Sequence, residues 1–447
     1  MKGTDNMNVK EMKAAACAAI DKNAEKIIAL GESIYREPEL GYKENKTSAK
    51  IRATLDEIGF AHQDGVALTG IITPVKGRDH KVNLAIMGEL DAVVAPSHPF
   101  ADPKTGAAHS CGHFAQSASV IGVAYALKES GVMDYLDGDI TLMHVPAEEF
   151  VELEYRKGLI DEGKVKLLGG KQEFIRLGVF DNVDMMIMQH TRTTEGDNPN
   201  PIKADAGGTG MGFIGKMIQY IGKESHAAAP YMGVNALKAA QIGLAAIDAN
   251  RETFQDKDTI RVHPIITKGG DLVNVVPADV RIETYVRGLS VDAVLDASAK
   301  VDRALQAGAY AMGAKCIITQ LPGYIIPFES EELKDVVYEN LVEIFGKDSC
   351  QRNGSGGSTD ASDVSVIIPT VHMNIGGAKG IGHSPDYVIA CPEMAYLNAA
   401  KTLVCTAIDL LANGAEKAIN VKSNFKAPMT KEEYLAKWCG LKAGEDF

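Results

Sequence analysis

The chain has 447 residues, of which 45% are hydrophobic and 23% charged, with 59 acidic residues against 46 basic ones and a formal net charge of −13. This composition is globular and excludes a charge-rich disordered chain, and the lack of a long Lys/Arg run argues against sequence-independent binding to nucleic acid. Because no run approaches the roughly 18 to 20 apolar residues of a membrane span and the N-terminus is polar, we expect a cytoplasmic protein that binds no membrane.

The first half of the chain alternates between helical and strand-like patterns. Apolar residues recur at helical spacing over residues 9–36, and a second helix over residues 45–58 should end at Gly59, a typical C-terminal cap. Short apolar runs follow (GIITPVK, VNLAIMGEL, ITLMHVPAEE and MMIMQHT), with a helix expected over residues 115–128. Apolar strands that alternate with helices indicate an α/β fold with a mainly parallel sheet.

The pattern changes near residue 205. We expect strands at 213–222, 259–267, 280–287 and 314–320, and helices at 234–250 and 291–311. This βαββαβ order is typical of a ferredoxin-like unit, so we predict an α+β domain at residues 206–321, inserted into a discontinuous α/β domain at 1–205 and 322–447. Beyond it we expect a helix at 330–345, a strand at 364–368 and a helix at 395–412. The polar C-terminal residues around the only tryptophan, Trp438, should form a loosely packed tail or a subunit contact.

Side chains of the metal-binding types follow the apolar strands, at the edge where an open α/β sheet gathers its functional groups. They are Glu89, Asp91, His109, Cys111, His113, Glu148, Glu149 and His190, with His383 far along the chain. Each alone has a common structural explanation, such as a core cysteine or a glutamate at a helix start. Together they are the residue types that bind Zn²⁺ and related divalent ions, so the sequence indicates a metal site.

The adjacent glutamates allow a division of labour. Successive side chains point in different directions, so one carboxylate can bind a metal while the other stays free. The free one can accept a proton from metal-bound water, whose pKa a metal lowers toward neutrality. Such a pair indicates a hydrolase.

These motifs resemble those of the M20 metallopeptidase and amidohydrolase family, in particular its aminoacylase-like, hippurate hydrolase-like and aminobenzoyl-glutamate hydrolase-like branch. The resemblance rests on nine segments in the family's order: REPELGY, GELDAV, GAAHSCGHFAQ, PAEE, QH, GKESHAAAPYMGVNAL, GGDLVNVVPADVRIETYVRG, GSTDASDVS and GHSPD. It implies an enzyme that cleaves the amide bond of an N-acyl or N-aroyl amino acid. A dipeptidase on the same fold, or a catalytically degenerate metal-binding homologue, stays open as an alternative.

The resemblance also implies a role for each motif residue. It implies a site for two divalent ions per subunit, zinc or manganese, with cobalt or nickel as further options, and its ligands are Cys111, His113, Glu149, His190 and His383. Glu148 matches the general base, and Asp91 matches an aspartate beside the metals that orients a ligand. The role of Glu89 stays open.

For the inserted domain, the resemblance implies a lid through which the chain forms a homodimer. His226 matches a histidine that supports the developing oxyanion, often from the partner subunit. Asn274 and Arg287 match groups that hold the small-molecule substrate's carboxylate or carbonyl, which suits the fork of a guanidinium. From spacing alone, Arg287 is more often a strand-end arginine in a surface ion pair.

The loop NGSGGSTDASD is rich in glycine but lacks the lysine of a phosphate-binding loop, so we expect no nucleotide site. The resemblance implies that Thr359, Asp360 and Asp363 border the substrate pocket; the alternative is a flexible surface loop with helix-capping serine and aspartate. Phe114 replaces the Asp or Asn that usually follows CGH, which would alter the surroundings of the ligands or open an apolar wall for an aromatic group. His98 is interpreted as a loop histidine near the pocket mouth.

Overall fold

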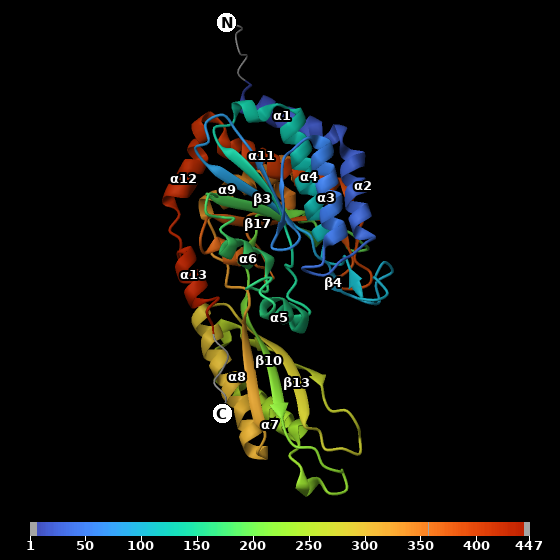
Figure 1. Ribbon diagram of the computed structural model, residues 1–447. Coiled ribbons are helices and arrows are strands. Elements are labelled where there is room, and N and C mark those ends of the chain that lie inside the picture. The colour runs from blue at the N-terminus through green and yellow to red at the C-terminus, as the bar shows by residue number, and fades with distance from the viewer. Residues whose placement is uncertain (1–6, 356, 442–447) are drawn as a thin grey trace. The chain divides into compact units, whose positions relative to one another are not determined.

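A computed structural model describes residues 7–355 and 357–441, and its contacts divide the chain into two units (Figure 1). The first comprises the described parts of Met1–Thr209, Phe328–Gly356 and Asp363–Thr430. The second comprises Gly210–Pro327, Gly357–Ser362 and the described part of Lys431–Phe447. The second unit therefore runs on to Pro327 and also takes in two further segments outside the predicted 206–321.

The first unit is built on a nine-stranded sheet. Its order is β1 (Gln63–Val66), β2 (Gly70–Val75), β6 (Asp139–Val145), β3 (Asn83–Glu89), β7 (Met185–Thr193), β17 (Thr370–Lys379), β8 (Ala204–Asp205) and β15 (Cys350–Gln351), and β18 (Val388–Ile389) pairs with β17. The four central strands β6, β3, β7 and β17 are parallel neighbours. This arrangement confirms the predicted α/β fold with a mainly parallel sheet.

Helices cover this sheet, and α4 (His113–Glu129) lies at the centre of their packing. It contacts β3, β6 and β7 and also packs against α1 (Val9–Lys22), α2 (Ala24–Tyr35), α3 (Asn45–Ile58) and α11 (Ala399–Leu411). Nearly all of its residues are buried, which explains why its sequence is apolar and small on every side. The remaining helices here are α5 (Leu153–Asp161), α6 (Gly170–Leu177), α9 (Glu331–Phe345), α10 (Ala361–Ser365, at the boundary of the units) and α12 (Glu416–Asn424).

Two sequence predictions for this unit are wrong in detail. The helix expected over residues 9–36 is interrupted at Asn23, whose side-chain amide donates a hydrogen bond of 2.9 Å to the Ala19 carbonyl and so competes with the helical ladder. The strand expected at 364–368 instead begins at Thr370, directly after Pro369, because proline has no N–H to give to a sheet.

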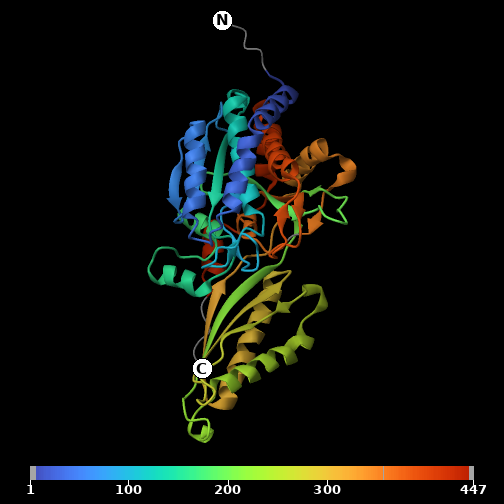
Figure 2. The same ribbon diagram turned by 90° about the vertical axis from the view of Figure 1, so that its right-hand side faces the viewer.

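The second unit is an antiparallel sheet covered on one face by two helices that lie side by side, α7 (Ala236–Ala249) and α8 (Val291–Met312) (Figure 2). Its strand order is β11 (Arg261–Val262), β13 (Asp279–Gly288), β10 (Gly212–Ile221) and β14 (Lys315–Pro322), and β12 (Ile265–Lys268) also pairs with β13. The chain order is the predicted βαββαβ, except that the strand expected at 259–267 is two short strands.

The C-terminal residues also pack in the second unit. After α13 (Lys431–Lys437), Trp438 is 2% exposed and its indole N–H donates a hydrogen bond of 2.8 Å to the Gly323 carbonyl. The prediction of a loosely packed tail is therefore wrong at Trp438.

One helical segment, Glu393–Leu411, has the length and hydropathy of a membrane span, contrary to the expectation from sequence. Its most apolar window is 78% buried inside the protein. A helix that is apolar and buried in this way has the features of a core helix, so its composition is weak evidence for a membrane.

Candidate metal centre

The side chains predicted from the strand ends gather at one edge of the parallel sheet. β3 ends at Glu89, β6 ends shortly before Glu148, and β7 carries His190. Because β3, β6 and β7 are parallel neighbours, their carboxyl ends meet at the same edge, and the residues at or just beyond those ends converge.

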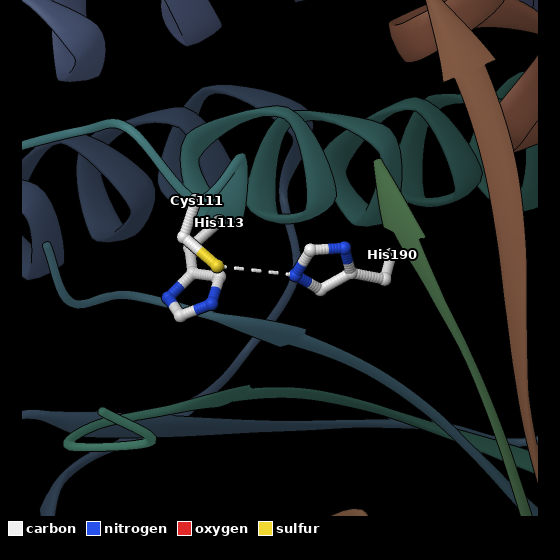
Figure 3. Close-up of side chains that lie close together, drawn as sticks. All are labelled: Cys111, His113 and His190. Atoms are coloured by element: carbon white, nitrogen blue, oxygen red, sulfur yellow. Dashed lines mark hydrogen bonds between the residues drawn. The ribbon is translucent and has the colours of Figure 1, made fainter. Parts of the chain in front are cut away.

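The Cys-Gly-His segment turns sharply into α4. Gly112 has a φ of 105°, in the region that favours glycine, and a Cβ there would lie 2.6 Å from Tyr387 Oη and 3.0 Å from Thr191 Cβ. This close approach lets Cys111 end the loop and His113 begin the helix, with the Cys111 sulfur directed toward His190 and the His113 ring beside that sulfur (Figure 3).

Gly112→Ala is expected to lower the free energy of unfolding by about 1–3 kcal/mol, because alanine would be strained at this φ and its methyl group would press on Tyr387. Gly131→Ala is the matched control, since Gly131 also has a positive φ but has no atom within 4 Å of an added Cβ. Denaturant unfolding of the two variants measures the difference. Equal losses would mean that the contacts at Gly112 relax without cost.

Cys111, His113 and His190 form a first group of donors, whose ligand atoms all lie within 4.8 Å of one another. Cys111 Sγ lies 3.3 Å from His190 Nε2 (Figure 3). His113 Nε2 is buried and has no hydrogen-bond partner among the described residues. A buried ring nitrogen without a partner, beside a sulfur and a second imidazole, fits a bound metal ion.

Cys111, Glu149 and His383 form a second group within the same distance limit. His383 Nε2 lies 3.2 Å from Glu149 Oε1, and the His383 backbone N–H donates a hydrogen bond of 2.7 Å to the Ser110 carbonyl, which holds this loop beside Cys111. Since Cys111 belongs to both groups, its sulfur lies where two neighbouring ions could share it. The donor set of thiolate, imidazole and carboxylate suits zinc and other divalent transition metals.

Asp91 connects the two groups. Its Oδ1 lies 3.1 Å from His113 Nδ1, and its Oδ2 accepts a hydrogen bond of 2.8 Å from the Glu149 backbone N–H. Glu148 is buried beside it, with Oε2 3.8 Å from His113 Nε2. Asp91 therefore orients the ring of one donor and the backbone of another, the geometry that a positioning residue needs.

The charges of this cluster depend on each other. Burial alone would raise the pKa of the Cys111 thiol, but His113 and His190 lower it well below its usual value. Burial and the charge of Cys111 raise the pKa of Glu149 to about 7, and hydrogen bonds with Cys111 and Glu149 raise the pKa of His383 to about 11. The cluster thus has an anionic sulfur at its centre, which a cation would stabilise.

Comparison with known proteins identifies the family. Residues 85–409 match the family model for peptidase family M20/M25/M40. The chain belongs to this family. It is a metal-dependent hydrolase that acts on amide or peptide bonds, and the resemblance drawn from its motifs is confirmed.

Two curated relatives have different substrates in their names. The Xaa-Arg dipeptidase of Mus musculus is 27% identical over 449 residues, which cover 95% of this chain and 94% of that protein. The IAA-amino acid hydrolase ILR1-like 4 of Arabidopsis thaliana is 26% identical over 285 residues, which cover 62% of this chain and 59% of that protein. These relatives leave the substrate of this chain open.

Two solved structures share the fold. A dinuclear metal-binding peptidase of the M20 family from Bacillus subtilis has a TM-score of 0.64 and 21% identity, with 88% of this chain and 99% of that chain covered. The aminobenzoyl-glutamate utilization protein from Klebsiella pneumoniae has a TM-score of 0.65 and 18% identity, with 87% and 97% covered. At these identities the likeness concerns the fold alone.

Three further candidate residues of this M20 chain lie in the second unit. A backbone bridge joins His226 to Val275, and the Ala227 N–H donates a hydrogen bond of 2.9 Å to the Asn274 carbonyl, so His226 and Asn274 are neighbours. Arg287 is half-buried on β13, with its guanidinium 5.5 Å from the ring centres of Phe213 and Tyr285. No ion pair involves Arg287 in the part of the chain that the structure describes, which disfavours the surface ion pair considered from sequence.

The glycine-rich loop has both capping and buried polar groups. Thr359 Oγ1 accepts a hydrogen bond of 3.2 Å from the Ala361 N–H, so a threonine acts here where the alternative expected a serine or an aspartate. Asp360 and Asp363 are fully buried, and Asp363 Oδ1 accepts a hydrogen bond of 3.3 Å from the Gln172 side chain.

Phe114 and His98 are core residues in the structure. Phe114 is 1% exposed and lies against the rings of Tyr35 and Tyr396, so it forms no open apolar wall. His98 is also buried, and its Nε2 lies 3.2 Å from both Tyr35 Oη and the Tyr387 carbonyl oxygen. The expectation of an open apolar wall at Phe114 is wrong, whereas His98 lies in a loop, as expected, and is buried there.

Sequence reasoning missed three buried polar residues beside the donors. Lys171 Nζ lies 2.5 Å from Glu89 Oε1, the Gln116 side chain donates a hydrogen bond of 2.7 Å to Glu89 Oε2, and the His372 ring lies 5.8 Å from that of His190. Lys171 and Gln116 lie on α6 and α4, far in sequence from Glu89. No local pattern distinguishes them from surface residues, although a glutamine in the largely apolar α4 is a weak signal.

Proposed function

We propose that the chain hydrolyses the amide bond of an N-acyl or N-aroyl amino acid by means of two divalent ions held by Cys111, His113, Glu149, His190 and His383. The observation that carries this proposal is that two donor groups share the Cys111 sulfur, with the buried Glu148 beside them. Ions bound there would lower the pKa of a water molecule and polarise the substrate carbonyl.

The chain's own residues would carry out the proton transfers and orient the groups. Glu148 would accept the proton of the attacking water and return it to the departing amine. Asp91, through its contacts with His113 Nδ1 and the Glu149 N–H, would keep both donors in place during this exchange. His226 would donate a hydrogen bond to the developing oxyanion, and Asn274, Arg287, Thr359 and Asp360 would contribute to substrate binding.

A screen of substrates with and without a chelator tests the proposal. The panel contains N-acetyl, N-benzoyl and aminobenzoyl amino acids, with dipeptides as the second class, because the likeness to the Xaa-Arg dipeptidase over nearly the whole chain favours that alternative. Hydrolysis of acyl amino acids that the chelator abolishes supports the proposal. Preference for dipeptides, which carry a free amine, would replace it with a dipeptidase.

Metal analysis of protein purified without added metal identifies the ions. We propose zinc or manganese, because cysteine with histidine favours zinc while the mixed donors also accept manganese, cobalt and nickel. Two equivalents of metal per chain support the shared-sulfur arrangement, and a single equivalent argues against it.

We also propose that the chain forms a homodimer through the second unit. Large apolar side chains of this unit are exposed, among them Tyr231, Met232, Ile265, Leu272 and Tyr310. Apolar surface of this kind favours association. Sedimentation of the full chain measures the oligomeric state, and a monomer at all concentrations contradicts the proposal.

Arg287→Lys is expected to raise KM by about tenfold or more with a smaller effect on kcat, because lysine cannot bind a carboxylate bidentately or stack as Arg287 does against Phe213 and Tyr285. Arg281→Lys, an exposed change on the same strand, is the control and should leave both constants unchanged. Steady-state kinetics measures both. An unchanged KM in Arg287→Lys would remove Arg287 from the substrate site.

A further inference from the structure

Glu89 is a fully buried carboxylate whose two oxygens have different partners. Oε1 lies 2.5 Å from the ammonium of Lys171, which is itself fully buried. Oε2 accepts a hydrogen bond of 2.7 Å from the Gln116 side chain and lies 3.2 Å from His113 Nε2. One oxygen is therefore paired with the Lys171 ammonium, while the other is directed toward His113, a proposed metal ligand.

The contact between Glu89 and His113 is not a hydrogen bond. His113 Nδ1 faces two acceptors, the Asp91 carboxylate and the Asp91 carbonyl, so this nitrogen carries the proton and Nε2 presents its lone pair. His113 Nε2 has no hydrogen-bond partner within the described residues, although Glu89 Oε2 is so near. Two buried electron pairs at this separation repel each other unless a proton or a metal ion lies between them.

The separation is that of two ligands on one ion. Ligands about 2.0–2.2 Å from a metal, at angles between a right angle and the tetrahedral angle, lie about 2.8–3.6 Å apart. The 3.2 Å between Glu89 Oε2 and His113 Nε2 falls in this range. So do the 3.3 Å between Cys111 Sγ and His190 Nε2 and the 3.2 Å between Glu149 Oε1 and His383 Nε2.

A simpler interpretation is that Glu89 only neutralises Lys171. That role needs a single oxygen, and it explains neither the placement of Oε2 beside a ring nitrogen nor the grouping of Glu89, His113 and Glu148 ligand atoms within 4.8 Å. Lys171 and Gln116 instead hold the carboxylate so that Oε2 stays at the donor cluster.

We propose that Glu89 is an additional protein ligand of the ion held at His113 Nε2, with Lys171 and Gln116 as the residues that position it. This proposal rests on the two-ion site proposed above. It gives that ion a fully buried carboxylate, whereas the other ion has the carboxylate of Glu149 together with the exposed His383. The two ions should therefore differ in affinity, and the one at Glu89 should be the tighter.

The test compares Lys171→Met with the double variant Glu89→Gln/Lys171→Met. The double variant contains neither buried charge of this pair, and in Lys171→Met the bound metal ion balances the charge of Glu89. Zn²⁺ is titrated into the metal-free full chain against a competing chelator, and Co²⁺ absorption reports the surroundings of the ion. We expect two ions in wild type and in Lys171→Met, and at least a tenfold weaker first ion with an altered Co²⁺ spectrum in the double variant. Equal affinities and spectra in Lys171→Met and the double variant would overturn the proposal.

A second variant covers the case in which these proteins do not fold. Glu89→Asp keeps the buried charge beside Lys171 but withdraws the carboxylate by one methylene, and it should weaken the same ion. Unchanged Zn²⁺ affinity in Glu89→Asp would also overturn the proposal. Wild-type protein with fewer than two ions would instead reject the two-ion site itself, so the two failures are distinguishable.

Discussion

Glu148→Gln is expected to lower kcat by about 10²–10⁴-fold while both metal ions and the fold are retained. Glu148 is buried beside the donor cluster but lies outside the two groups that share Cys111. Glutamine has nearly the same shape as glutamate and cannot accept the proton of the attacking water. The loss should therefore fall on the chemical step and leave KM nearly unchanged.

Steady-state kinetics and metal analysis of the same preparation test this prediction. Glu154→Gln is the matched control, because Glu154 is an exposed glutamate on the nearby helix α5. This control should have wild-type kcat. Near-normal turnover by Glu148→Gln with two bound ions would show that another group is the base.

The placement of the metal-binding side chains was predictable because they lie at the ends of buried strands, and such strands are recognisable in the sequence as apolar runs. The runs that end near Glu89, Glu148 and His190 are continuous and apolar, as expected for strands buried on both faces. Parallel neighbours bring their carboxyl ends together, so three distant positions in the sequence become one place in the fold.

The surroundings of the donors were not predictable in the same way. Lys171 pairs with Glu89 across 82 positions in the sequence, and nothing in its own helix indicates that pairing. Phe114 follows a metal-binding motif, yet it is buried against Tyr35 and Tyr396, because the first turn of α4 directs His113 toward the donors and Phe114 toward the core. Such side-chain environments arise from tertiary packing, which single-sequence patterns do not encode.

Cys111→Ser is expected to remove both ions, an effect larger than that of losing any other single donor. Cys111 is the one residue present in both groups, while His190 belongs to the first and His383 to the second, among the residues that the structure describes. Serine keeps the size of the side chain, but its hydroxyl stays protonated near neutral pH, whereas the cysteine sulfur binds metal as a thiolate. The thiolate also places a negative charge between the two dications. Without that charge the two ions would repel each other more strongly.

Metal content after dialysis separates the roles of these donors. We expect fewer than about 0.2 equivalents of metal per chain in Cys111→Ser, because each ion loses an anionic ligand. Its affinity should then fall by more than the roughly 10–100-fold that is lost when a residue hydrogen-bonded to a ligand is replaced. His190→Ala and His383→Ala should each retain one ion, the one held by the other group. If Cys111→Ser instead retained one ion, the sulfur would serve a single metal, and the second ion would need a different bridging group. The ion retained by Cys111→Ser would then be compared with the ion retained by His190→Ala and by His383→Ala. The histidine variant that retains the same ion has lost the ion that Cys111 holds.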